Sequence, residues 1–194
     1  MIIEQFTFVH RYKRDSVISH LVDEIRAKCK EICPNAIEPK LENHTTSIPP
    51  ILAPLDEMRY MTIGLGIQDV LNGEVHSERN RAEVAGLDFF RNPRNDALVL
   101  RLKVSPEYKE FICFWRENMH KFTNWKFPPF GDTYNPHICI IEDYGLFENL
   151  HPYMNEIEKL VQPISFHLPS PKVMIKRGGK EETHWEEFDP LMGL

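Results

Sequence analysis

The chain has 194 residues, of which 42% are hydrophobic, 11% are aromatic and 27% are charged. Fractions of this size are typical of soluble globular domains, so they exclude disordered, collagen-like and coiled-coil proteins. The 29 acidic and 23 basic side chains give a net charge of −6, which disfavours binding to long nucleic acid through its phosphates. We therefore expect a single domain over residues 1–194, whose ligand, if phosphorylated, is short or small.

Four cysteines are too few for a disulfide framework, so we expect reduced thiols. Cys29 and Cys33 are spaced like two metal ligands on a helix, but no second pair with zinc-finger spacing follows. We expect neither a metal ion nor another cofactor. Residues 1–14 lack the charge order of a signal peptide, and no stretch reaches eighteen apolar residues. The sequence therefore predicts a cytoplasmic protein that does not enter membranes.

The chain opens with a predicted strand and a predicted helix. Residues 2–9 are rich in β-branched and aromatic side chains, which favours a strand. Asp15 is a candidate N-cap for a helix over residues 17–32, where apolar side chains recur every three or four positions. Pro34 ends this pattern.

Residues 43–48 predict a short strand, which we expect to end at Pro49 and Pro50 because proline cannot donate to a sheet. The apolar spacing from Leu55 then predicts an amphipathic helix over residues 55–71. Residues 83–90 and 97–104 follow as a predicted hairpin of two strands.

Ser105, Pro106 and Glu107 are typical of a helix start, with a hydroxyl cap, a proline at the first position and an early acid. We expect its buried face to carry Tyr108, Phe111, Ile112, Trp115 and Met119. A loop rich in proline and aromatic residues, 125–135, leads to a predicted strand over residues 137–141.

The C-terminal part predicts a helix over residues 150–161, with Pro152 in its first turn. Strands are expected over residues 172–175 and 183–188, with Gly178 and Gly179 forming the turn between them. Across the whole chain, the order of strands and helices occurs twice. This doubling predicts an α+β protein with two similar lobes.

Two histidines occupy matching places in this doubled order. His44 precedes Thr46 by two positions and His137 precedes Cys139 by two positions, so on a strand each pair points to one face. A single His-x-Ser/Thr/Cys triplet is expected by chance, and each histidine alone is typical of a structural side chain. The matched pair favours a shared functional site, because an unpartnered imidazole at the mouth of an apolar strand costs free energy.

The segments His44-Thr45-Thr46 and Asn135-Pro136-His137-Ile138-Cys139-Ile140 resemble the two signature motifs of the two-histidine (2H) phosphoesterases. This superfamily contains 2′–5′ RNA ligase-like and cyclic phosphodiesterase proteins. Residues 84–90 and 97–100 are similar to the family's strand pair between the motifs, and residues 172–191 resemble its closing hairpin. The resemblance implies a bilobal fold in which two pseudo-symmetric antiparallel-sheet lobes, with helices outside, surround a central cleft.

The resemblance also implies a hydrolase: a metal-independent phosphodiesterase that opens a cyclic phosphate, such as a 2′,3′-cyclic nucleotide or RNA end, or cleaves a 2′-linked or cyclic oligonucleotide. His44 and His137 would be the catalytic residues, because in-line attack on phosphorus needs a base and an acid on opposite sides. Imidazole titrates near neutral pH and can do either, so the two roles stay open at this point.

Thr46 and Cys139 would bind the phosphate by donating hydrogen bonds to its non-bridging oxygens as charge builds on them. Cys139 departs from the usual Thr or Ser, and a thiol is a weaker donor. Tyr134, Phe130 and Arg91 are candidate substrate contacts. A packed loop accounts equally well for Tyr134 and Phe130, and a solvated face is the more usual role of a basic run such as that of Arg91. We expect a monomer that binds a nucleotide or short RNA and no long duplex.

Two other functions fit the same sequence. A non-catalytic nucleotide or RNA-end binding protein would keep the cleft and tolerate Cys139 in the second motif. A structural or interaction protein with coincidental motifs would have no affinity for nucleotides.

Overall fold

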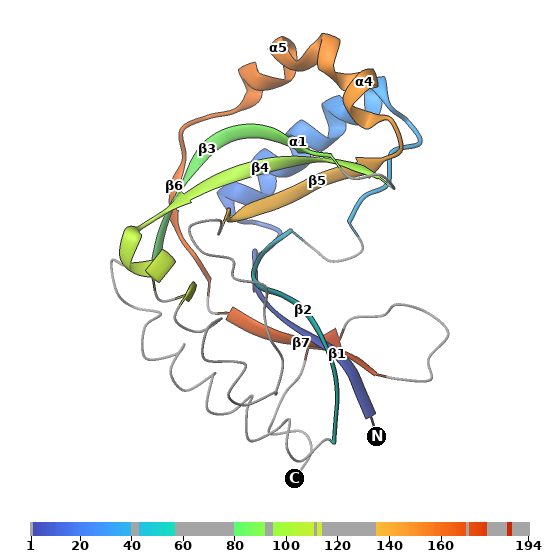
Figure 1. Ribbon diagram of the computed structural model, residues 1–194. Coiled ribbons are helices and arrows are strands. Elements are labelled where there is room, and N and C mark those ends of the chain that lie inside the picture. Colours follow the sequence, from blue (N-terminus) through green and yellow to red (C-terminus); the bar gives the residue numbers. More distant parts are fainter. Residues whose placement is uncertain are drawn as a thin grey trace.

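The computed structural model describes residues 2–39, 43–56, 80–91, 95–110, 112–113, 135–169, 171–177 and 186–187. This part of the chain is an α+β structure built on one curled sheet, in which every strand pairing is antiparallel (Figure 1). The strand order is β6-β3-β4-β5-β2-β1-β7-β8. The described part of the chain therefore confirms the predicted α+β class with antiparallel strands.

The sheet consists of two groups of strands that meet between β5 and β2. The first group contains β6 (Ser165–His167), β3 (Arg81–Phe90), β4 (Asp96–Val104) and β5 (His137–Asp143). The second group contains β2 (His44–Asp56), β1 (Ile2–Arg11), β7 (Pro171–Arg177) and β8 (Glu186–Glu187). Within the described ranges, Thr45 and Ile138 form the single register pair between the groups, and we call this junction the seam.

The prediction that Pro49 and Pro50 end the second strand is wrong, because β2 continues to Asp56. The β1–β2 register explains how the sheet accommodates them. Phe8 pairs with Ile48 and Phe6 pairs with Ile51, so the two prolines lie opposite the single residue Thr7. This is a β-bulge, one of the few places in a sheet where proline fits, because the extra residue leaves the hydrogen-bond ladder. The predicted helix over 55–71 therefore cannot begin at residue 55, and residues 57–71 lie outside the described part.

The hairpin of β3 and β4 is confirmed and each strand is slightly longer than predicted. Its register shifts between Val84 and Gly86, where Gly86 has a φ of +120°. A bulge with glycine in a positive-φ conformation increases the local twist, which bends β3 around the sheet. The short strand β6, which pairs with the start of β3, was not predicted.

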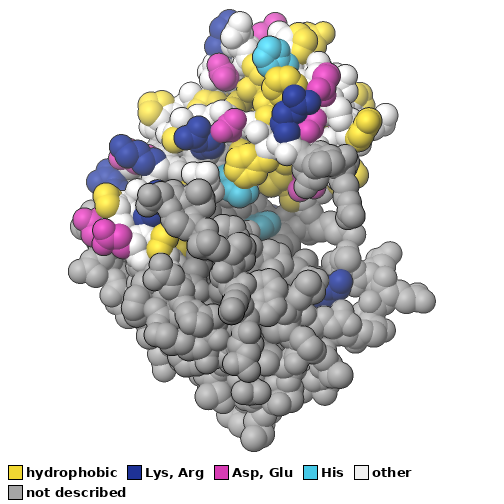
Figure 2. All heavy atoms as spheres, viewed as in Figure 1, with side chains coloured by type: hydrophobic (Ala, Val, Ile, Leu, Met, Phe, Trp, Pro, Cys, Tyr) yellow, Lys and Arg dark blue, Asp and Glu magenta, His cyan; other side chains and the backbone are white. Residues whose placement is uncertain are grey.

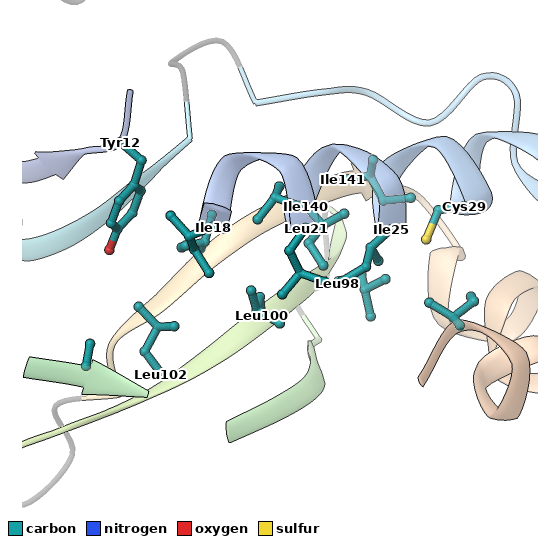
Figure 3. Packing of buried hydrophobic residues seen from close by; sticks show 14 of the residues in the cluster. Tyr12, Ile18, Leu21, Ile25, Cys29, Leu98, Leu100, Leu102, Ile140 and Ile141 are labelled. Atoms are coloured by element: carbon teal, nitrogen blue, oxygen red, sulfur yellow. The ribbon is translucent and has the colours of Figure 1, made fainter. Parts of the chain in front are cut away.

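The helix α1 (Val17–Ile32) confirms its predicted bounds, but Ser16 and not Asp15 is its N-cap, since the Ser16 side chain accepts a hydrogen bond from the Ser19 amide. Its apolar stripe lies against β4 and β5 and forms the main core (Figure 3). Val17 is the exception and is 56% exposed. The fully buried members of this core include Ile18, Ile25, Leu98, Leu100, Ile112 and Ile138.

The predicted helix over 150–161 begins four residues earlier and is divided into short pieces. These are α4 (Leu146–Leu150), η3 (His151–Tyr153), α5 (Met154–Ile157) and η4 (Glu158–Leu160), where η denotes a 3-10 helix. Pro152 lies at the N-terminal end of η3. In Figure 1, α1, α4 and α5 lie on the same side of β3, β4 and β5.

Ser105 caps the following helix as predicted, because its Oγ accepts a hydrogen bond from the Tyr108 amide at 3.1 Å. Residues 106–110 and 112–113 are helical, and Tyr108 and Ile112 are buried as expected. Phe111, Trp115, Met119, the 125–134 part of the loop, Gly178, Gly179 and residues 183–185 and 188 lie outside the described residues. The strand partner predicted for 172–175 is confirmed where it is described, because β8 pairs with β7.

No helix in the described ranges is both long enough and apolar enough to cross a bilayer.

Candidate functional site at the seam

The seam brings the two histidine motifs onto one face of the sheet. Directly opposed residues on antiparallel strands point to the same side, and their neighbours point to the other. Thr45 and Ile138 are opposed, and both are completely buried on the side that carries the core. The motif side chains flanking them therefore belong to the opposite face. These are His44, Thr46, His137 and Cys139.

The same register sets the spacing of the four side chains. On either side of the Thr45–Ile138 pair, His44 and Thr46 on β2 stand across the seam from Cys139 and His137 on β5, although Thr45–Ile138 is the pair in register. In a regular antiparallel pair, opposed Cβ atoms are about 4.5–5.5 Å apart and diagonal neighbours are about 7–8 Å apart. At this spacing, two imidazoles can reach one phosphate group from different sides.

His137 is held in one orientation by its neighbours. Its Nδ1 lies 2.8 Å from the Asn135 carbonyl oxygen, which can only accept, so Nδ1 carries the proton and Nε2 carries the lone pair when the ring is neutral. The ring of Phe90 packs edge-to-face on the imidazole with centroids 4.5 Å apart. Burial lowers the pKa of His137, and the hydrogen bond to Asn135 offsets only part of that effect. The neutral imidazole is therefore favoured near pH 7.

Cys139 is partly buried and its Sγ lies 3.4 Å from Oε1 of Glu142, to which the thiol donates. Burial, with the charge of Glu142 as the second cause, raises the pKa of Cys139 well above its ordinary value. The group is therefore a thiol with its hydrogen directed at a carboxylate, and a bound phosphate would compete with Glu142 for this weak donor.

His44 and Thr46 are half-buried at the start of β2. Between them, Thr45 points into the core, where its Oγ1 lies 2.7 Å from the hydroxyl of Tyr12. This bond satisfies a buried hydroxyl and fixes the strand on which both motif residues stand.

Arg26 on α1 connects the strands where they diverge beyond the seam. Its Nε donates to the Ile140 carbonyl at 3.0 Å, and its Nη2 donates to Oδ1 of Asn43 at 2.8 Å. Ile140 follows Cys139 in the second motif and Asn43 precedes His44 in the first. The guanidinium therefore links both motif strands, and its side chain is only 14% exposed. The sequence analysis did not identify Arg26. Its position next to Ile25, beside the apolar stripe of the predicted helix, was a signal that could have indicated it.

Three further cations belong to the motif face or its border by register. Arg11 is opposite His44, Arg101 is opposite His137, and Lys172 is opposite Val9, the partner of Thr46. Arg11 and Lys172 both contact Glu187, at 3.2 and 2.7 Å, and Arg101 lies 3.4 Å from Asp88. Figure 2 shows histidine side chains beside hydrophobic ones at the border of the described surface, with mixed charges beyond them. Only the strand register reveals that Arg11 and His44 are neighbours.

Arg91 directly follows β3 and contacts α4. Its Nη2 lies 2.6 Å from Oε1 of Glu148, and its guanidinium carbon lies 4.5 Å from the centre of the Phe147 ring. It lines a cavity of about 420 Å³ with Asp96, Tyr144, Gly145, Glu148 and Asn149. Tyr134 and Phe130, the other two candidate substrate contacts, lie outside the described residues.

Among the described residues, no group of three or more His, Cys, Asp or Glu side chains is arranged to hold a metal ion. Cys29 and Cys33 are both buried in or beside α1, and burial raises the pKa of each thiol, to about 12 for Cys29. They are therefore protonated core side chains.

Comparison with known proteins gives likenesses of structure only. No protein-family model and no curated protein matches the sequence. The crystal structure of ATU0111 from Agrobacterium tumefaciens strain C58, a conserved protein of unknown function, matches with a TM-score of 0.51 at 16% identity, over 96% of this chain and 85% of that chain. This likeness shows a similar fold.

Two structures of Kluyveromyces marxianus Usb1 are also similar, one of them with uridine monophosphate. Both have a TM-score of 0.49, at 10% and 11% identity, over 95% of this chain and 97% of each Usb1 chain. A similarity at this level carries no argument about the site, so the assignment of a function depends on the geometry of the seam.

Proposed function

We propose that the chain is a metal-independent 2H-type phosphodiesterase, which hydrolyses a cyclic phosphate or a 2′-linked or cyclic oligonucleotide between two histidines. The observation that carries the proposal is the seam. The pairing of Thr45 with Ile138 puts His44 and His137, which are far apart in sequence, on one face of the sheet and on adjacent strands. A histidine that only packs in the core needs no second histidine near it, whereas acid and base catalysis at one phosphorus atom needs two such groups.

The surroundings of His137 favour the role of general base. With Nδ1–H donating to Asn135, the free lone pair of Nε2 can take a proton from water, and the lowered pKa keeps that lone pair available at neutral pH. His44 would then be the acid that protonates the departing ribose oxygen. Water would attack from the His137 side, and the bond to the leaving oxygen would break on the His44 side.

Thr46 and Cys139 would donate to the non-bridging oxygens, where negative charge increases in the transition state. Thr46 and His44 flank Thr45 on β2, and Cys139 and His137 flank Ile138 on β5, so each histidine would have a donor on the other side of the seam. Arg11 and Arg101 stand beside the histidines on the same face and would draw the anionic substrate to it. In this proposal, a monomer with two lobes of similar construction encloses the substrate.

The decisive experiment is turnover by purified protein in EDTA. A panel of 2′,3′-cyclic mononucleotides, cyclic di- and trinucleotides and 2′–5′ oligomers is analysed by mass spectrometry. We expect one class to be cleaved, and His44→Ala and His137→Ala each to lower kcat/KM by 10² to 10⁴, the usual contribution of acid–base catalysis. His20→Ala, at an exposed position on α1, is the control and should change nothing. Activity that survives both active-site substitutions would disprove the proposal.

A non-catalytic nucleotide-binding protein is the second candidate, and the contact between Cys139 and Glu142 favours it. A carboxylate 3.4 Å from the second phosphate donor occupies that donor and repels an anion. Cys139→Thr separates the two candidates, because a hydroxyl is the stronger donor. Turnover should rise several-fold in a weakened enzyme, whereas a binding protein would remain inactive and gain only affinity.

A further inference from the structure

Two cations stand beside His44 on the motif face of the sheet. The β1–β2 register puts Arg11 directly opposite His44, so both side chains point to the same face on neighbouring strands. One strand further, the β1–β7 register puts Lys172 opposite Val9, which is itself opposite Thr46. Figure 1 shows β2, β1 and β7 side by side. Arg11 and Lys172 therefore adjoin the first histidine motif.

Glu187 on β8 joins these two cations, and we call the three side chains the cation cluster. Its Oε2 lies 3.2 Å from the Arg11 Nη1, and its Oε1 lies 2.7 Å from the Lys172 Nζ. Each carboxylate oxygen thus has one cation, which is also how two non-bridging oxygens of a phosphate can be bound. The side chains of Arg11, Lys172 and Glu187 are 30%, 43% and 38% exposed, so a ligand can reach them.

The cation cluster carries one net positive charge, because its two cations share a single carboxylate. The opposite side of the seam differs in this respect. Arg101, which is opposite His137, has a carboxylate of its own, Asp88, at 3.4 Å. A phosphodiester carries one negative charge, so it would neutralise the cluster beside His44, whereas the pair beside His137 has no excess charge to offer.

Glu187 is a weak competitor for a phosphate at the cation cluster. Ion pairs between exposed side chains contribute little, because water screens the charges and two flexible side chains must be held in place. The guanidinium has five N–H donors and the ammonium has three, so both have more donors than one carboxylate needs. A phosphate can therefore share the two cations with Glu187 or displace it.

We propose that the cation cluster binds a second phosphate of the substrate, one nucleotide away from the scissile phosphate on the His44 side. The inference rests on the proposed function, since it assumes that the scissile phosphate lies between His44 and His137. In that mechanism His44 protonates the leaving oxygen, so the second phosphate belongs to the leaving part of the substrate. The substrate is then a 2′-linked or cyclic oligonucleotide with at least two phosphates, and not a cyclic mononucleotide.

Lys172→Gln tests this site, with Lys28→Gln as the matched control. Lys28 pairs with Glu31 on α1 at 2.8 Å and is 35% exposed, so the control removes the same charge from a similar ion pair elsewhere. Every protein in this series also carries His137→Ala, which removes the proposed base and keeps the probes intact.

The probes are three 2′–5′-linked triadenylates of equal length. One has both phosphates, and each of the others has an uncharged methylphosphonate at one of the two linkages. Calorimetry should show that either replacement lowers affinity about tenfold, as for loss of a charged hydrogen bond. In Lys172→Gln, the replacement at one linkage should cost less than about threefold, because that phosphate has lost a partner. If Lys172→Gln and Lys28→Gln show the same costs at both linkages, the inference is wrong.

Glu187→Gln provides a test in the opposite direction, which a poorly folded variant would not imitate. Without the competing carboxylate, both cations are available to the phosphate, so affinity for the fully charged triadenylate should rise several-fold. The probe that is uncharged at the cluster linkage should gain little, and Glu31→Gln on α1 should change nothing. An unchanged or lower affinity of Glu187→Gln for the fully charged probe would overturn the inference.

This inference and the proposed function can fail separately, because the calorimetry does not depend on turnover. A protein that binds the second phosphate as described but cleaves no oligonucleotide with its histidines intact would retain the inference and disprove the proposed function. A protein that cleaves 2′–5′ or cyclic oligonucleotides, but whose Lys172→Gln variant pays the full cost at both linkages, would retain the proposed function and disprove the inference.

Discussion

Two opposing effects act on the proton of His137. Burial under Phe90 and its surroundings disfavours the imidazolium ion, while the bond to the Asn135 carbonyl favours it. Burial is the larger effect, so the pKa is lower than the ordinary value of 6.5. The same bond also determines which nitrogen is free, and this makes His137 better suited to accept a proton than to donate one.

This balance predicts the pH dependence of the proposed enzyme. A base must be neutral to act, so kcat/KM should rise with pH and level off once His137 loses its proton. Because its pKa is lowered, the midpoint of this acidic limb should fall below 6.5. Phe90→Ala exposes the imidazole, raises its pKa and should move the midpoint to higher pH. Phe89→Leu, at the neighbouring position where the ring packs on Phe147, is the control. An acidic limb that stays in place in Phe90→Ala would show that another group is the base.

At the scale of elements, the seam depends on α1 as much as on the strands it joins. Beyond the Thr45–Ile138 pair, the backbone of β5 pairs with Ile37 and no longer with β2. The side chain of Arg26 bridges the space between Asn43 and Ile140. A planar guanidinium can donate in both directions at once, which a lysine ammonium on a flexible chain does less well. Arg26 is therefore a positioning residue for the two motifs.

Arg26→Lys keeps the charge and should weaken this bridge. We expect kcat to fall about tenfold while KM changes by less than twofold, because small displacements of catalytic groups affect the reaction more than binding. Ile157→Val on α5 controls for stability, since shortening a buried side chain costs about 1 kcal/mol at a place remote from the seam. The interpretation fails if Arg26→Lys loses no more kcat than Ile157→Val does at a similar loss of Tm.

The sequence predicted the elements well where one periodicity dominates, as in α1 and in the β3–β4 hairpin. It failed where contacts with distant parts of the chain determine the local structure. The prolines of β2 are accommodated by a bulge against β1, which no local pattern reveals. The composition of residues 146–160 favours a helix but does not show its division into α and 3-10 turns.

Part of the candidate site was also predictable, because it depends on a local pattern, the alternation of side chains along a strand. Strand alternation pairs His44 with Thr46 and His137 with Cys139, and the sequence alone supplies that. The register that joins the two pairs, and the contacts of Arg26 and Glu142, require the folded sheet. The two-lobed symmetry and the roles of the four motif residues stay predictions.

At the scale of the whole molecule, His10 ties together three distant segments. It stands on β1, its Nδ1–H donates to the Pro169 carbonyl, and its Nε2 accepts from the hydroxyl of Tyr108. The side chain is almost completely buried, and burial lowers its pKa to about 4, with the bond to Pro169 opposing that shift. A neutral His10 is thus part of the folded structure.

Stability should therefore depend on pH through His10. Its pKa is near 6.5 in the unfolded chain and about 4 in the folded one, so protonation favours unfolding. The stabilisation is fully present above pH 6.5 and is lost as the pH falls to 4, by on the order of 3 kcal/mol. Urea unfolding at pH 7, 6, 5 and 4 measures this loss. Over the same pH range, His10→Gln should lose less stability than the unaltered protein. His20→Gln, at an exposed position, should lose as much as the unaltered protein. Equal losses in all three proteins would contradict the prediction.

The strand order also bears on how the molecule is assembled. β1, although first in the chain, lies between β2 and the late strand β7, and β2 meets β5 only after the intervening hairpin has been made. Contacts between such distant segments slow folding, because a large loop must close before any pair forms. During synthesis, β1 and β2 leave the ribosome as a ribbon with two open edges, and such edges can pair with other chains. The first histidine motif lies on one of these edges until β5 arrives, so chaperone protection of nascent chains should matter most in this interval.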